Sequence, residues 1–599
     1  MTKNEEVALK RKLLALAQSG QFVSSEKLAW YLVEHMANDL EIWFALAQIQ
    51  RALGKDDLAL QSFERVAARK SNNRANALAS MIPLCIKLEL LDKGVNAAKK
   101  QLKIEPKSAL AHYQLAVMLW KLQKMHQAAK HFKKAVFFDP NNAEYNLLWS
   151  EVLAMTGDMN GALAQLEHTK LLDKNNDKIH LKRLMFQNYS DLQSDEEVFR
   201  CHAEFGKRLE ARYPTIECFP VRGAVKEITR KIRVAYLSTD FMRHSISYFF
   251  LPIVKGYDSS QFELYCYSDM LESNADEVTE QLKGFSTLWR DVYSLTDEQL
   301  YTQIRNDEID ILVDLAGYAG KRSRMPVFAR KASQVQVTYL AYPNTTGLTR
   351  MDYRIVDEFT DPTGIAEVQS SEKLVRLSNS FLCYQPEELS PLIEPLPADN
   401  ADIFTFGSFN NYMKITDDII DAWSKILSDV PNSQLYVKAL AFADQELQNH
   451  FVARCKAVGI ERKRLLLSNP IIDQQSHLSK YNKVDLHLDT YPYNGTTTTL
   501  EAMWMGVPTL TWAGGSHRSR VGHSIMSNLG LADYVAQTKE EYIDLAVSKA
   551  NDLDALRTVR AGSRARISTS AIMDSKSFIK ELEGFYLQSI KELESKGEL

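Results

Sequence analysis

The sequence predicts an α-helical array followed by two α/β domains of the doubly wound type. Three observations lead to this prediction. A period of 34 residues runs through residues 75–166, short apolar strands alternate with helical stretches from residue 232 onward, and a second such set begins at residue 404. Because strands that alternate with helices form parallel sheets covered by helices, each set indicates one domain. At 599 residues the chain is too long for a single core.

The N-terminal period is that of tetratricopeptide repeats. Ala75, Ala109 and Ala143 begin successive copies, and Pro106 and Pro140 close two of them at the same offset. Small and large residues through which paired helices pack recur in an early, a middle and a late copy: Trp43, Leu46, Ala47, Gly54, Ala59 and Phe63; Leu115, Ala116, Leu119, Ala128, Phe132 and Ala135; Trp149, Ser150, Leu153, Gly157, Ala162 and Leu166. This agreement over consecutive copies predicts a tetratricopeptide superhelix.

We expect the superhelix to cover residues 1–176, with a degenerate capping pair at residues 6–38. The concave groove of stacked helix pairs binds extended peptide or another protein, so a protein is the expected partner of the array. The alternative is that the short array only packs against its neighbour or mediates homodimerisation. Residues 177–230 predict a helical connector that Pro214 and Pro220 interrupt.

Ten apolar segments predict the strands of the two α/β domains. They are Ile232–Ser238, Phe262–Ser268, Asp310–Ala316, Val335–Leu340 and Tyr353–Val356, and then Phe404–Phe409, Gln434–Lys438, Arg464–Leu467, Val484–Leu488 and Thr509–Trp512. The Pro-rich, acidic segment Pro386–Asp402 is the predicted linker. We therefore expect domains over residues 231–390 and 400–575, followed by a C-terminal helix over residues 576–599.

Polar motifs follow the predicted strands at their carboxyl ends, where ligands of doubly wound domains bind. They occupy residues 238–248, 314–322 and 341–347 in the first domain and residues 409–415, 469–477 and 489–499 in the second. This clustering predicts a ligand-binding cleft between two facing domains.

The last of these motifs predicts an anion site. An apolar strand runs into Asn494-Gly495 and four threonines, Thr496 to Thr499, which open a helix. Free N–H groups and the positive end of the helix dipole favour a phosphate or diphosphate at such a turn. Glu501 either complements the dipole or reaches a ribose hydroxyl. The alternative is an ordinary helix N-cap.

Composition and charge exclude several function classes. The 72 basic and 76 acidic residues leave a net charge of −4 without long blocks of one sign, so we expect no nucleic-acid partner. No window approaches the roughly 18 apolar residues of a membrane span. Six scattered cysteines, Cys85, Cys201, Cys218, Cys266, Cys383 and Cys455, suit structural thiols in a reducing compartment. We therefore expect a cytoplasmic protein.

Several motifs together give the chain a family resemblance. They are Asp240-Phe-x-x-His244, Phe409-Asn-Asn-x-x-Lys-Ile415, Pro431-Asn-Ser433, the segment Leu488 to Thr499, and Met505-Gly-Val-Pro508. With the repeats, nearly the whole chain resembles the protein O-glycosyltransferases that include the O-linked N-acetylglucosamine transferase and its plant relative SPINDLY. The resemblance implies two Rossmann-like lobes of the GT-B type. It also implies metal-independent, inverting transfer from a nucleotide sugar to Ser or Thr hydroxyls of a protein acceptor bound by the repeat groove.

The resemblance also assigns residues to the nucleotide-sugar site of the second lobe. Lys414 stands at the position of the family's phosphate-binding lysine, where a cation would meet the charge that develops on the leaving diphosphate. His477 matches the base-stacking histidine, with Lys480 one helical turn on, and Glu501 takes the ribose position. The remaining expected contacts are Asn411, Asn494, Gly495, Thr496, Thr497 and Thr498.

In the first lobe, which the resemblance makes the acceptor side, His244 is the candidate to contact the acceptor hydroxyl or to act as base. Asp310, Asp314 and Tyr318 are candidate accessory residues, and the alternative for the two carboxylates is that they cap turns. The only Asp-x-Asp, Asp552 to Asp554, starts a late helix and is expected to cap it, so no metal site is predicted.

The donor sugar stays open in the sequence. Thr496 replaces a histidine of the animal N-acetylglucosamine enzyme, and together with Glu501 and the run His244 to Phe249 it brings the chain closer to SPINDLY and to O-fucosylation from GDP-fucose. Uridine donors dominate the wider family, so UDP-N-acetylglucosamine is the expected donor and GDP-fucose the alternative. Two other hypotheses are a tetratricopeptide scaffold with an inactive transferase fold, and transfer to a non-protein acceptor.

Overall fold

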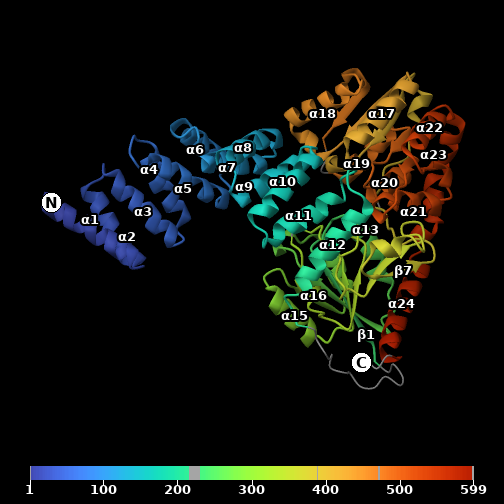
Figure 1. The fold of residues 1–599 in the computed structure, drawn as a ribbon, viewed down its shortest axis with the longest axis horizontal. Coiled ribbons are helices and arrows are strands. Elements are labelled where there is room, and N and C mark those ends of the chain that lie inside the picture. The colour runs from blue at the N-terminus through green and yellow to red at the C-terminus, as the bar shows by residue number, and fades with distance from the viewer. Residues whose placement is uncertain (1, 215–229, 321, 388, 470–472, 596–599) are drawn as a thin grey trace. The chain divides into compact units, whose positions relative to one another are not determined.

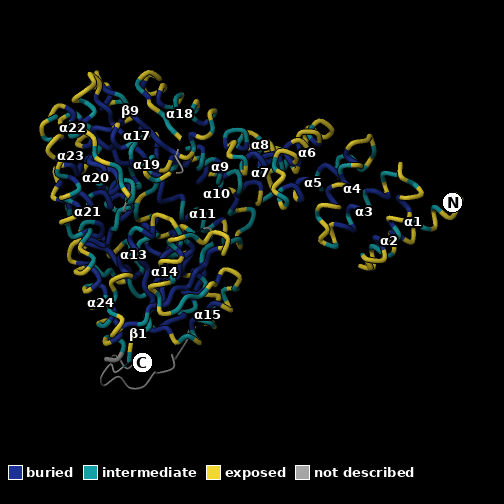
Figure 2. The backbone as a smooth tube through the Cα atoms, turned by 180° about the vertical axis from the view of Figure 1, so that it is seen from behind, coloured by how far each residue is buried: buried dark blue, intermediate teal, exposed yellow. Residues whose placement is uncertain are grey.

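The structure is a computed structural model that describes residues 2–214, 230–320, 322–387, 389–469 and 473–595. It consists of two compact units, Met1–Asn176 with Ala443–Leu447, and Asp177–Phe442 with Gln448–Leu599. Figure 1 shows the helical repeats of the first unit in blue and the two sheets of the second in green to orange. Buried residues run along the inner faces of the helix pairs and through both sheets (Figure 2).

The first unit is a succession of antiparallel helix pairs. The helices are α1 Lys3–Gln18, α2 Phe22–His35, α3 Leu40–Ala52, α4 Asp56–Ala67, α5 Arg74–Lys87, α6 Leu91–Ile104, α7 Ala109–Lys121, α8 Met125–Phe138, α9 Ala143–Met155 and α10 Met159–Leu172. The predicted repeat starts are confirmed, because α7 and α9 begin at Ala109 and Ala143 and α5 begins one residue before Ala75.

Small residues let these helices pack closely. Ala47, Ala59, Ala116 and Ala128 are fully buried between neighbouring helices, with Phe132 beside them. Helix starts are fixed by side-chain caps, since Asp39, Ser108 and Asn142 accept backbone N–H groups of the first turns of α3, α7 and α9. The small and large side chains that alternate in the sequence thus pack against one another between the helices of the array.

The first lobe of the second unit is a seven-stranded parallel sheet in the order β3-β2-β1-β4-β5-β6-β7. Its strands are β1 Ile232–Ser238, β2 Phe262–Ser268, β3 Leu288–Asp291, β4 Ile311–Asp314, β5 Val335–Thr338, β6 Tyr353–Asp357 and β7 Lys373–Leu377. Its helices are α13 Ser247–Gly256, α14 Glu277–Phe285, α15 Asp297–Asn306 and α16 Met325–Ala329. The five predicted strands are confirmed. The sequence missed β3 and β7, the half-exposed edge strands, because they lack a continuous apolar run.

The second lobe is a six-stranded parallel sheet in the order β10-β9-β8-β11-β12-β13. Its strands are β8 Phe404–Ser408, β9 Ser433–Lys438, β10 Leu465–Ser468, β11 Leu486–Leu488, β12 Thr509–Trp512 and β13 Val535–Ala536. Its helices are α17 Asp417–Asp429, α18 Gln445–Ala457, α19 Gln474–Ser479, α20 Thr497–Trp504, α21 Val521–Asn528, α22 Lys539–Ala550 and α23 Leu553–Ser568. Only the two-residue β13 was not predicted. In each lobe the strand order reverses next to the first strand, and such a point opens a crevice for ligands.

Two helical segments far apart in the sequence complete the first lobe. The connector forms α11 Asp177–Gln187 and α12 Asp195–Glu210. A Cβ on Gly206 of α12 would lie 1.9 Å from the carbonyl oxygen of Gly347, so the contact between α12 and the lobe requires glycine there. The C-terminal helix α24, Ser575–Ser595, lies along β7 (Figure 1). Its Tyr586 hydroxyl lies 3.0 Å from that of Tyr236 in β1, so the chain returns to the first lobe after building the second.

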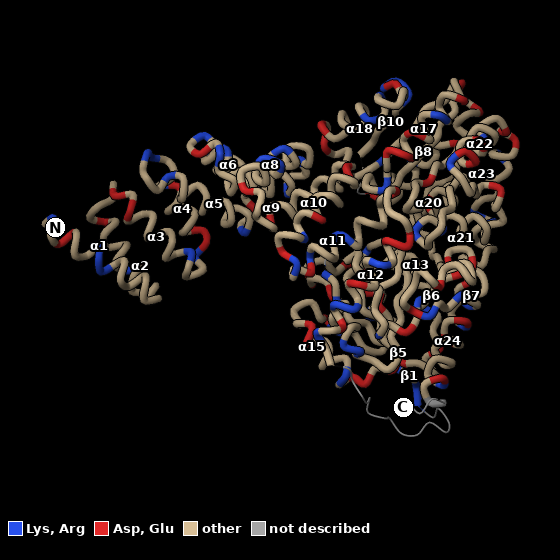
Figure 3. The backbone as a smooth tube through the Cα atoms, viewed as in Figure 1, with Lys and Arg blue, Asp and Glu red and all other residues tan. Residues whose placement is uncertain are grey.

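Charged residues of both signs are spread along the described part of the chain. Lys and Arg alternate with Asp and Glu along the traced backbone (Figure 3). Within the described residues no helix combines the length and apolar character that a membrane span requires. Five cysteines, Cys85, Cys201, Cys266, Cys383 and Cys455, are buried free thiols. Cys218 and Pro220 lie outside the described residues.

Candidate functional site

The turn between β11 and α20 is organised around one buried carboxylate. Asp489 accepts hydrogen bonds from the backbone N–H of Gly495 at 2.7 Å and of Thr490 at 2.9 Å, and from the Thr511 hydroxyl at 2.9 Å. Burial raises the pKa of Asp489 to about 6, and these bonds partly oppose that rise. The carboxylate therefore fixes the shape of the turn from inside, and leaves its outer side to a ligand.

The outer side of the turn is the N-terminus of α20. The N–H groups of the first helical turn, Thr497 to Thr499, have no acceptor within the helix and carry the positive end of its dipole. The hydroxyls are not equivalent. Thr498 donates to Asn410 Oδ1 and Thr499 donates to the Gly495 carbonyl, both at 3.0 Å. The Thr498 and Thr499 hydroxyls therefore have partners within the turn, and the expected phosphate contacts of Thr496, Thr497 and Thr498 stay predictions.

Gly495 is required by the tightness of this turn. A Cβ at this position would lie 2.4 Å from Thr498 Oγ1 and 2.9 Å from Thr499 Oγ1, inside the turn itself. The Asn494 side chain is likewise internal, since its amide donates to the Thr490 carbonyl at 2.9 Å. Asn494 and Gly495 therefore shape the site through the backbone.

Lys414 places an ammonium group beside this turn. It ends the short helix η4, Tyr412–Lys414, which follows β8. Its Nζ donates to the Asn494 carbonyl at 2.7 Å and lies 3.8 Å from the centroid of the Tyr493 ring. Desolvation lowers the pKa of Lys414 to about 8, although the charge of Asp489 opposes the shift. The ammonium thus lies against the start of the phosphate turn and is held there by an acceptor and an aromatic face.

The asparagine that contacts the turn is Asn410, whereas the expected ligand contact of Asn411 stays a prediction. Asn411 is exposed and caps η4 by accepting the Met413 N–H at 3.0 Å. Asn410 is buried, donates to Asp489 at 3.3 Å and accepts from Thr498, so it ties the end of β8 to the turn. The sequence does not show which of the two adjacent asparagines points inward. That depends on the direction of the backbone after the strand.

A second cluster surrounds His477 on α19. The imidazole Nδ1 accepts from the Lys438 ammonium, so Nε2 carries the proton and donates to Glu501 Oε2 at 3.0 Å. Glu501 also accepts from the Tyr481 hydroxyl and from Gln474 Nε2, each at 3.3 Å. These bonds fix both the tautomer of the ring and its plane, as a platform for a stacked base requires.

Lys438 is the functional candidate that sequence reasoning missed. It is buried at the carboxyl end of β9, and desolvation lowers its pKa to about 8, with Lys480 on the short helix η7, Lys480–Lys483, contributing repulsion. Its signal in the sequence is a single cation that ends the apolar strand Leu435-Tyr-Val-Lys438 at the ligand-binding edge.

His244 lies in the loop that follows β1 of the first lobe. It is exposed, and its Nδ1 accepts a long hydrogen bond, 3.4 Å, from the Ile246 N–H, while its carbonyl accepts from the Ser247 hydroxyl at 2.6 Å. With Nδ1 as acceptor the proton resides on Nε2, which is then a donor. In this arrangement Nε2 can donate a hydrogen bond, and the expected contact of His244 with the acceptor hydroxyl or its role as base stays a prediction.

A cleft of about 630 Å³ opens beside this loop between the two lobes. Residues of the first lobe, the linker and α19 line it: Arg243, Ser247, Tyr248, Leu251, Lys255, Glu277, Val278, Gln281, Gln385, Pro386, Glu387, Leu389, Asp473, Gln474 and Gln475. Gln474 also donates to Glu501, so the cleft reaches the His477 cluster. Its carboxylates are already held, since Arg243 pairs with Glu277 and Glu387 and the Ser476 N–H binds Asp473.

The three accessory candidates lie outside this constellation. Asp310 precedes β4, at the edge of the sheet opposite the ligand, where the Arg230 guanidinium donates to both of its oxygens at 2.7 Å. Asp314 ends β4 but accepts from the N–H groups of Ala316 and Gly317, and burial raises its pKa to about 6. Tyr318 donates to the Thr346 carbonyl inside the core at 2.6 Å. All three have structural partners, and their accessory roles stay predictions.

Residues that hold metals in proteins do not gather here. Among the residues that the structure describes, no group of three or more His, Cys, Asp or Glu is arranged to hold a metal ion. Asp552 caps α23 by accepting the Ala555 N–H, as expected from the sequence.

Comparison with known proteins decides the family. The model of glycosyl transferase family 41 matches residues 217–393 and 395–582, more than half of the chain. The chain belongs to glycosyl transferase family 41. A tetratricopeptide repeat model matches residues 40–73 and 109–142 of this family 41 member. The expected resemblance and the fold class are thereby confirmed.

The family 41 member is similar to plant proteins and to a solved bacterial structure. It is 36% identical over 406 residues to a probable UDP-N-acetylglucosamine–peptide N-acetylglucosaminyltransferase SPINDLY of Oryza sativa subsp. japonica, covering 67% of this chain and 43% of that protein. The SPINDLY protein of Arabidopsis thaliana is 35% identical over 419 residues, 70% of this chain and 45% of its own. A mutant O-GlcNAc transferase of Thermobaculum terrenum superposes with a TM-score of 0.79 at 30% identity, over 88% of this chain and 100% of that one. The chain spans less than half the length of the plant relatives.

Proposed function

We propose that this family 41 member is a protein O-glycosyltransferase that moves a sugar, with inversion, from a nucleotide sugar to Ser or Thr hydroxyls. One observation carries the proposal. The Lys414 ammonium donates to the Asn494 carbonyl at 2.7 Å. It thus lies at the same turn as the first N–H groups of α20, which are unpaired within the helix. A departing nucleoside diphosphate develops negative charge there, and fixed dipoles with a desolvated cation stabilise it without reorganisation.

The His477 cluster supports a nucleotide rather than a simple diphosphate. His477 is held on both ring nitrogens, by Lys438 and by Glu501, so its ring plane is fixed before a base arrives. Glu501 sits within the first two turns of α20, close in sequence to the phosphate turn, as a contact to the ribose requires. The proposed contacts then follow the order of the nucleotide, with the phosphate at Thr496, the ribose at Glu501 and the base at His477.

UDP-N-acetylglucosamine is the donor that we propose first, because the plant relatives are named for it. GDP-fucose is the second candidate. Thr496, at the N-cap of α20, has no imidazole to offer the phosphate or sugar, and this favours a donor site unlike that of the animal enzyme. We propose that neither donor needs a metal, because Lys414 provides the charge that a divalent ion would otherwise supply.

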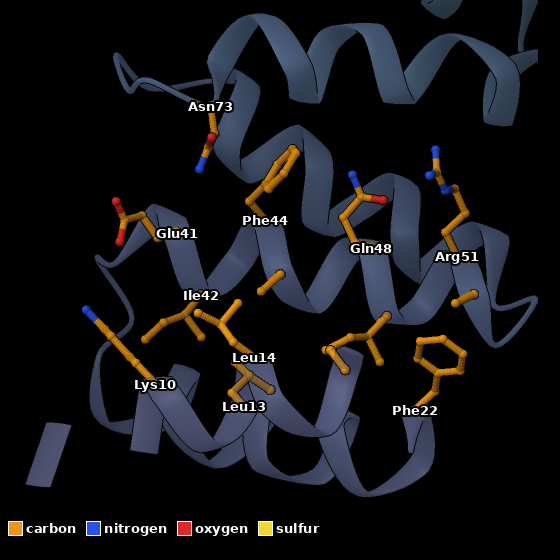
Figure 4. A pocket seen from close by; sticks show the side chains of 14 residues that line it. Lys10, Leu13, Leu14, Phe22, Glu41, Ile42, Phe44, Gln48, Arg51 and Asn73 are labelled. Carbon is orange, nitrogen blue, oxygen red and sulfur yellow. The ribbon is translucent and has the colours of Figure 1, made fainter. Parts of the chain in front are cut away.

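We propose that protein acceptors dock in the repeat array. A cavity of about 650 Å³ opens between α1, α2 and α3, with an apolar floor that includes Leu13, Leu14, Phe22 and Ile42 (Figure 4). Leu14 lines this cavity and is 56% exposed, so its side chain is accessible to an acceptor segment. Glu41 lies toward one end of the floor and Arg51 toward the other (Figure 4), so a segment with apolar residues between a base and an acid complements it.

Donor assays with both nucleotide sugars test the transferase. Purified full-length protein is incubated with UDP-N-acetylglucosamine or GDP-fucose, with and without EDTA, and sugar transfer and donor hydrolysis are measured. Binding of UDP and GDP is measured by thermal shift, where a nucleotide at 100 times its Kd stabilises by about 2.7 kcal/mol. Binding of neither nucleotide means a tetratricopeptide scaffold without catalysis. Hydrolysis without transfer to any protein favours a non-protein acceptor.

Leu14→Asp tests the docking cavity. The charge should raise the KM for protein acceptors about tenfold while donor hydrolysis stays unchanged, since one lost apolar anchor is worth about 1.5 kcal/mol. Leu58→Asp on α4 is the matched control, because Leu58 is a 40% exposed leucine that does not line the cavity. Equal KM values for the two variants would contradict docking at this cavity.

A further inference from the structure

The loop between α11 and α12 contacts the donor side of the second lobe. Tyr189 in this loop is only 7% exposed, and its ring centroid lies 5.0 Å from that of Tyr493. The same Tyr493 ring has the Lys414 ammonium 3.8 Å from its centroid. A residue of the helical connector is thus separated from the candidate phosphate-binding cation by a single aromatic ring.

A second route joins the same helix pair to Lys414. Arg518, between β12 and α21, is 3% exposed and donates to the Gln187 carbonyl at 2.5 Å and to Asp195 at 3.1 Å. Its own carbonyl accepts the Asn494 N–H at 2.9 Å, and the Asn494 carbonyl accepts Lys414. Both partners of the ammonium, the Tyr493 ring and the Asn494 carbonyl, are therefore held from α11, α12 and their loop.

Lysine depends on such partners for its position. Its ammonium is a point charge on a flexible four-carbon stem, without the planar fork that aligns arginine. Stabilisation of a developing charge falls when the cation is displaced by even 1 Å. Side chains that hold Tyr493 and Asn494 therefore affect the reaction without touching a substrate.

We propose that Tyr189 is a positioning residue of the donor site, which keeps Tyr493 against the Lys414 ammonium and makes the α11–α12 loop a part of the phosphate-binding site. This inference rests on the proposed transferase function. It assigns the segment that the sequence predicted as a helical connector a direct part in donor binding.

The protonation of Lys414 can be followed through the pH dependence of kcat/KM. A merely structural role of Tyr189 would leave this pH dependence unchanged. Burial lowers the pKa of Lys414 to about 8, and the titratable groups that face it are Asp489 below and the phenols of Tyr493 and, behind it, Tyr189. Loss of the Tyr189 ring admits water, which raises the pKa toward its usual value of about 10.4. The fall of kcat/KM above pH 8, which reports the free enzyme, should then move to higher pH.

The experiment compares Tyr189→Ala, Tyr189→Phe and Leu184→Ala. Tyr189→Ala should lower kcat about tenfold and move the alkaline limb of kcat/KM upward by at least half a pH unit, whereas Tyr189→Phe keeps the ring and should match the parent. Leu184→Ala removes a buried side chain of the adjoining helix α11 from the first-lobe core, and should lower thermal stability without moving the limb. Tyr189→Ala with parental kcat and an unmoved limb would overturn the proposal.

Two further measurements keep the outcome clear. Asp195→Asn weakens the second route at a partly exposed carboxylate, and it should move the alkaline limb of kcat/KM in the same direction. This variant therefore tests the proposal even where Tyr189→Ala does not fold. Binding of UDP and GDP as a function of pH reads the same linkage without turnover. If the parent binds neither nucleotide, the proposed function itself fails. If the parent binds and the variants match it at every pH, only the positioning role fails.

Discussion

The two lobes prepare their halves of the candidate site in opposite ways. In the second lobe, Asp489, Asn410 and Asn494 are buried, and each makes at least two hydrogen bonds that shape the phosphate turn. In the first lobe, His244 is exposed in a loop and its ring has one long bond of 3.4 Å. The candidate donor side is therefore fixed by internal hydrogen bonds, whereas the candidate acceptor side holds the ring of its histidine by one long bond.

This difference follows from the chemistry that each half must meet. Charge that develops on a diphosphate is stabilised best by dipoles that do not move. An acceptor protein must enter, align one hydroxyl and leave, and loops on a rigid scaffold serve that purpose. The comparison predicts large, uniform losses from changes in the second lobe and selective losses from changes in the first.

Lys414→Ala should give the largest effect. Loss of one preorganised donor to a developing charge costs about 2.7–4 kcal/mol, so transfer and donor hydrolysis should both fall about 100-fold or more. Lys425→Ala on α17, an exposed lysine that pairs with Asp429, is the control and should retain parental rates. A Lys414→Ala enzyme within threefold of the parent would remove the cation role and with it the preorganised donor side.

His244→Ala should lower sugar transfer much more than it lowers nucleotide binding. Transfer to a protein acceptor should fall about 10- to 100-fold, the lower range of positioned proton or hydrogen-bond donors. Affinity for UDP or GDP should change less than threefold, because the phosphate turn and the His477 cluster do not involve this loop. Binding is measured by calorimetry. An equal loss of nucleotide affinity would place His244 on the donor side.

Lys414→Met should lose activity but gain stability at neutral pH. Because burial lowers the folded-state pKa of Lys414 to about 8 from its usual value of 10.5, the unfolded chain binds more protons between these values. The parent is therefore destabilised by this lysine at pH 8 and below, and regains that stability as pH rises through pH 8 to 10.5. The variant should be about 1–3 kcal/mol more stable at pH 7, with the gap closing toward pH 10.5. Urea unfolding of both proteins at several pH values measures this difference, and a constant gap would contradict it.

Asp310→Asn should give the smallest effect on turnover. The carboxylate pairs with Arg230 at the far end of β4, so kcat should stay within about twofold, while the protein loses about 1–3 kcal/mol of stability because a buried carboxylate no longer makes its charge-assisted hydrogen bonds. Asp489→Asn, a matched change inside the phosphate turn, should lower nucleotide affinity instead. Equal kinetic losses in the two variants would mean that the opposite ends of the strands are not functionally distinct.

Local signals in the sequence predicted most of the fold and about half of the candidate site. The repeat starts, the ten strands and the phosphate turn follow from periodicity, apolar runs and turn residues, all of which are short-range. Edge strands β3 and β7 escaped because half-exposed strands do not alternate clearly. Lys438 escaped because a lysine at the end of a strand is normally solvated, and only its contact with His477 shows otherwise.

Thus the sequence by itself determined the helical array, the two doubly wound lobes and the position of Lys414, His477 and the threonine turn at strand ends. Only the tertiary structure decided which of the polar groups face the ligand. It turned Asn410 inward and Asn411 outward, bound the Thr498 hydroxyl internally, sent Asp310 to the far edge and brought Tyr189 to Tyr493. The physical reason is that a strand end fixes where a residue lies, whereas hydrogen bonds to elements distant in the chain fix where its side chain points.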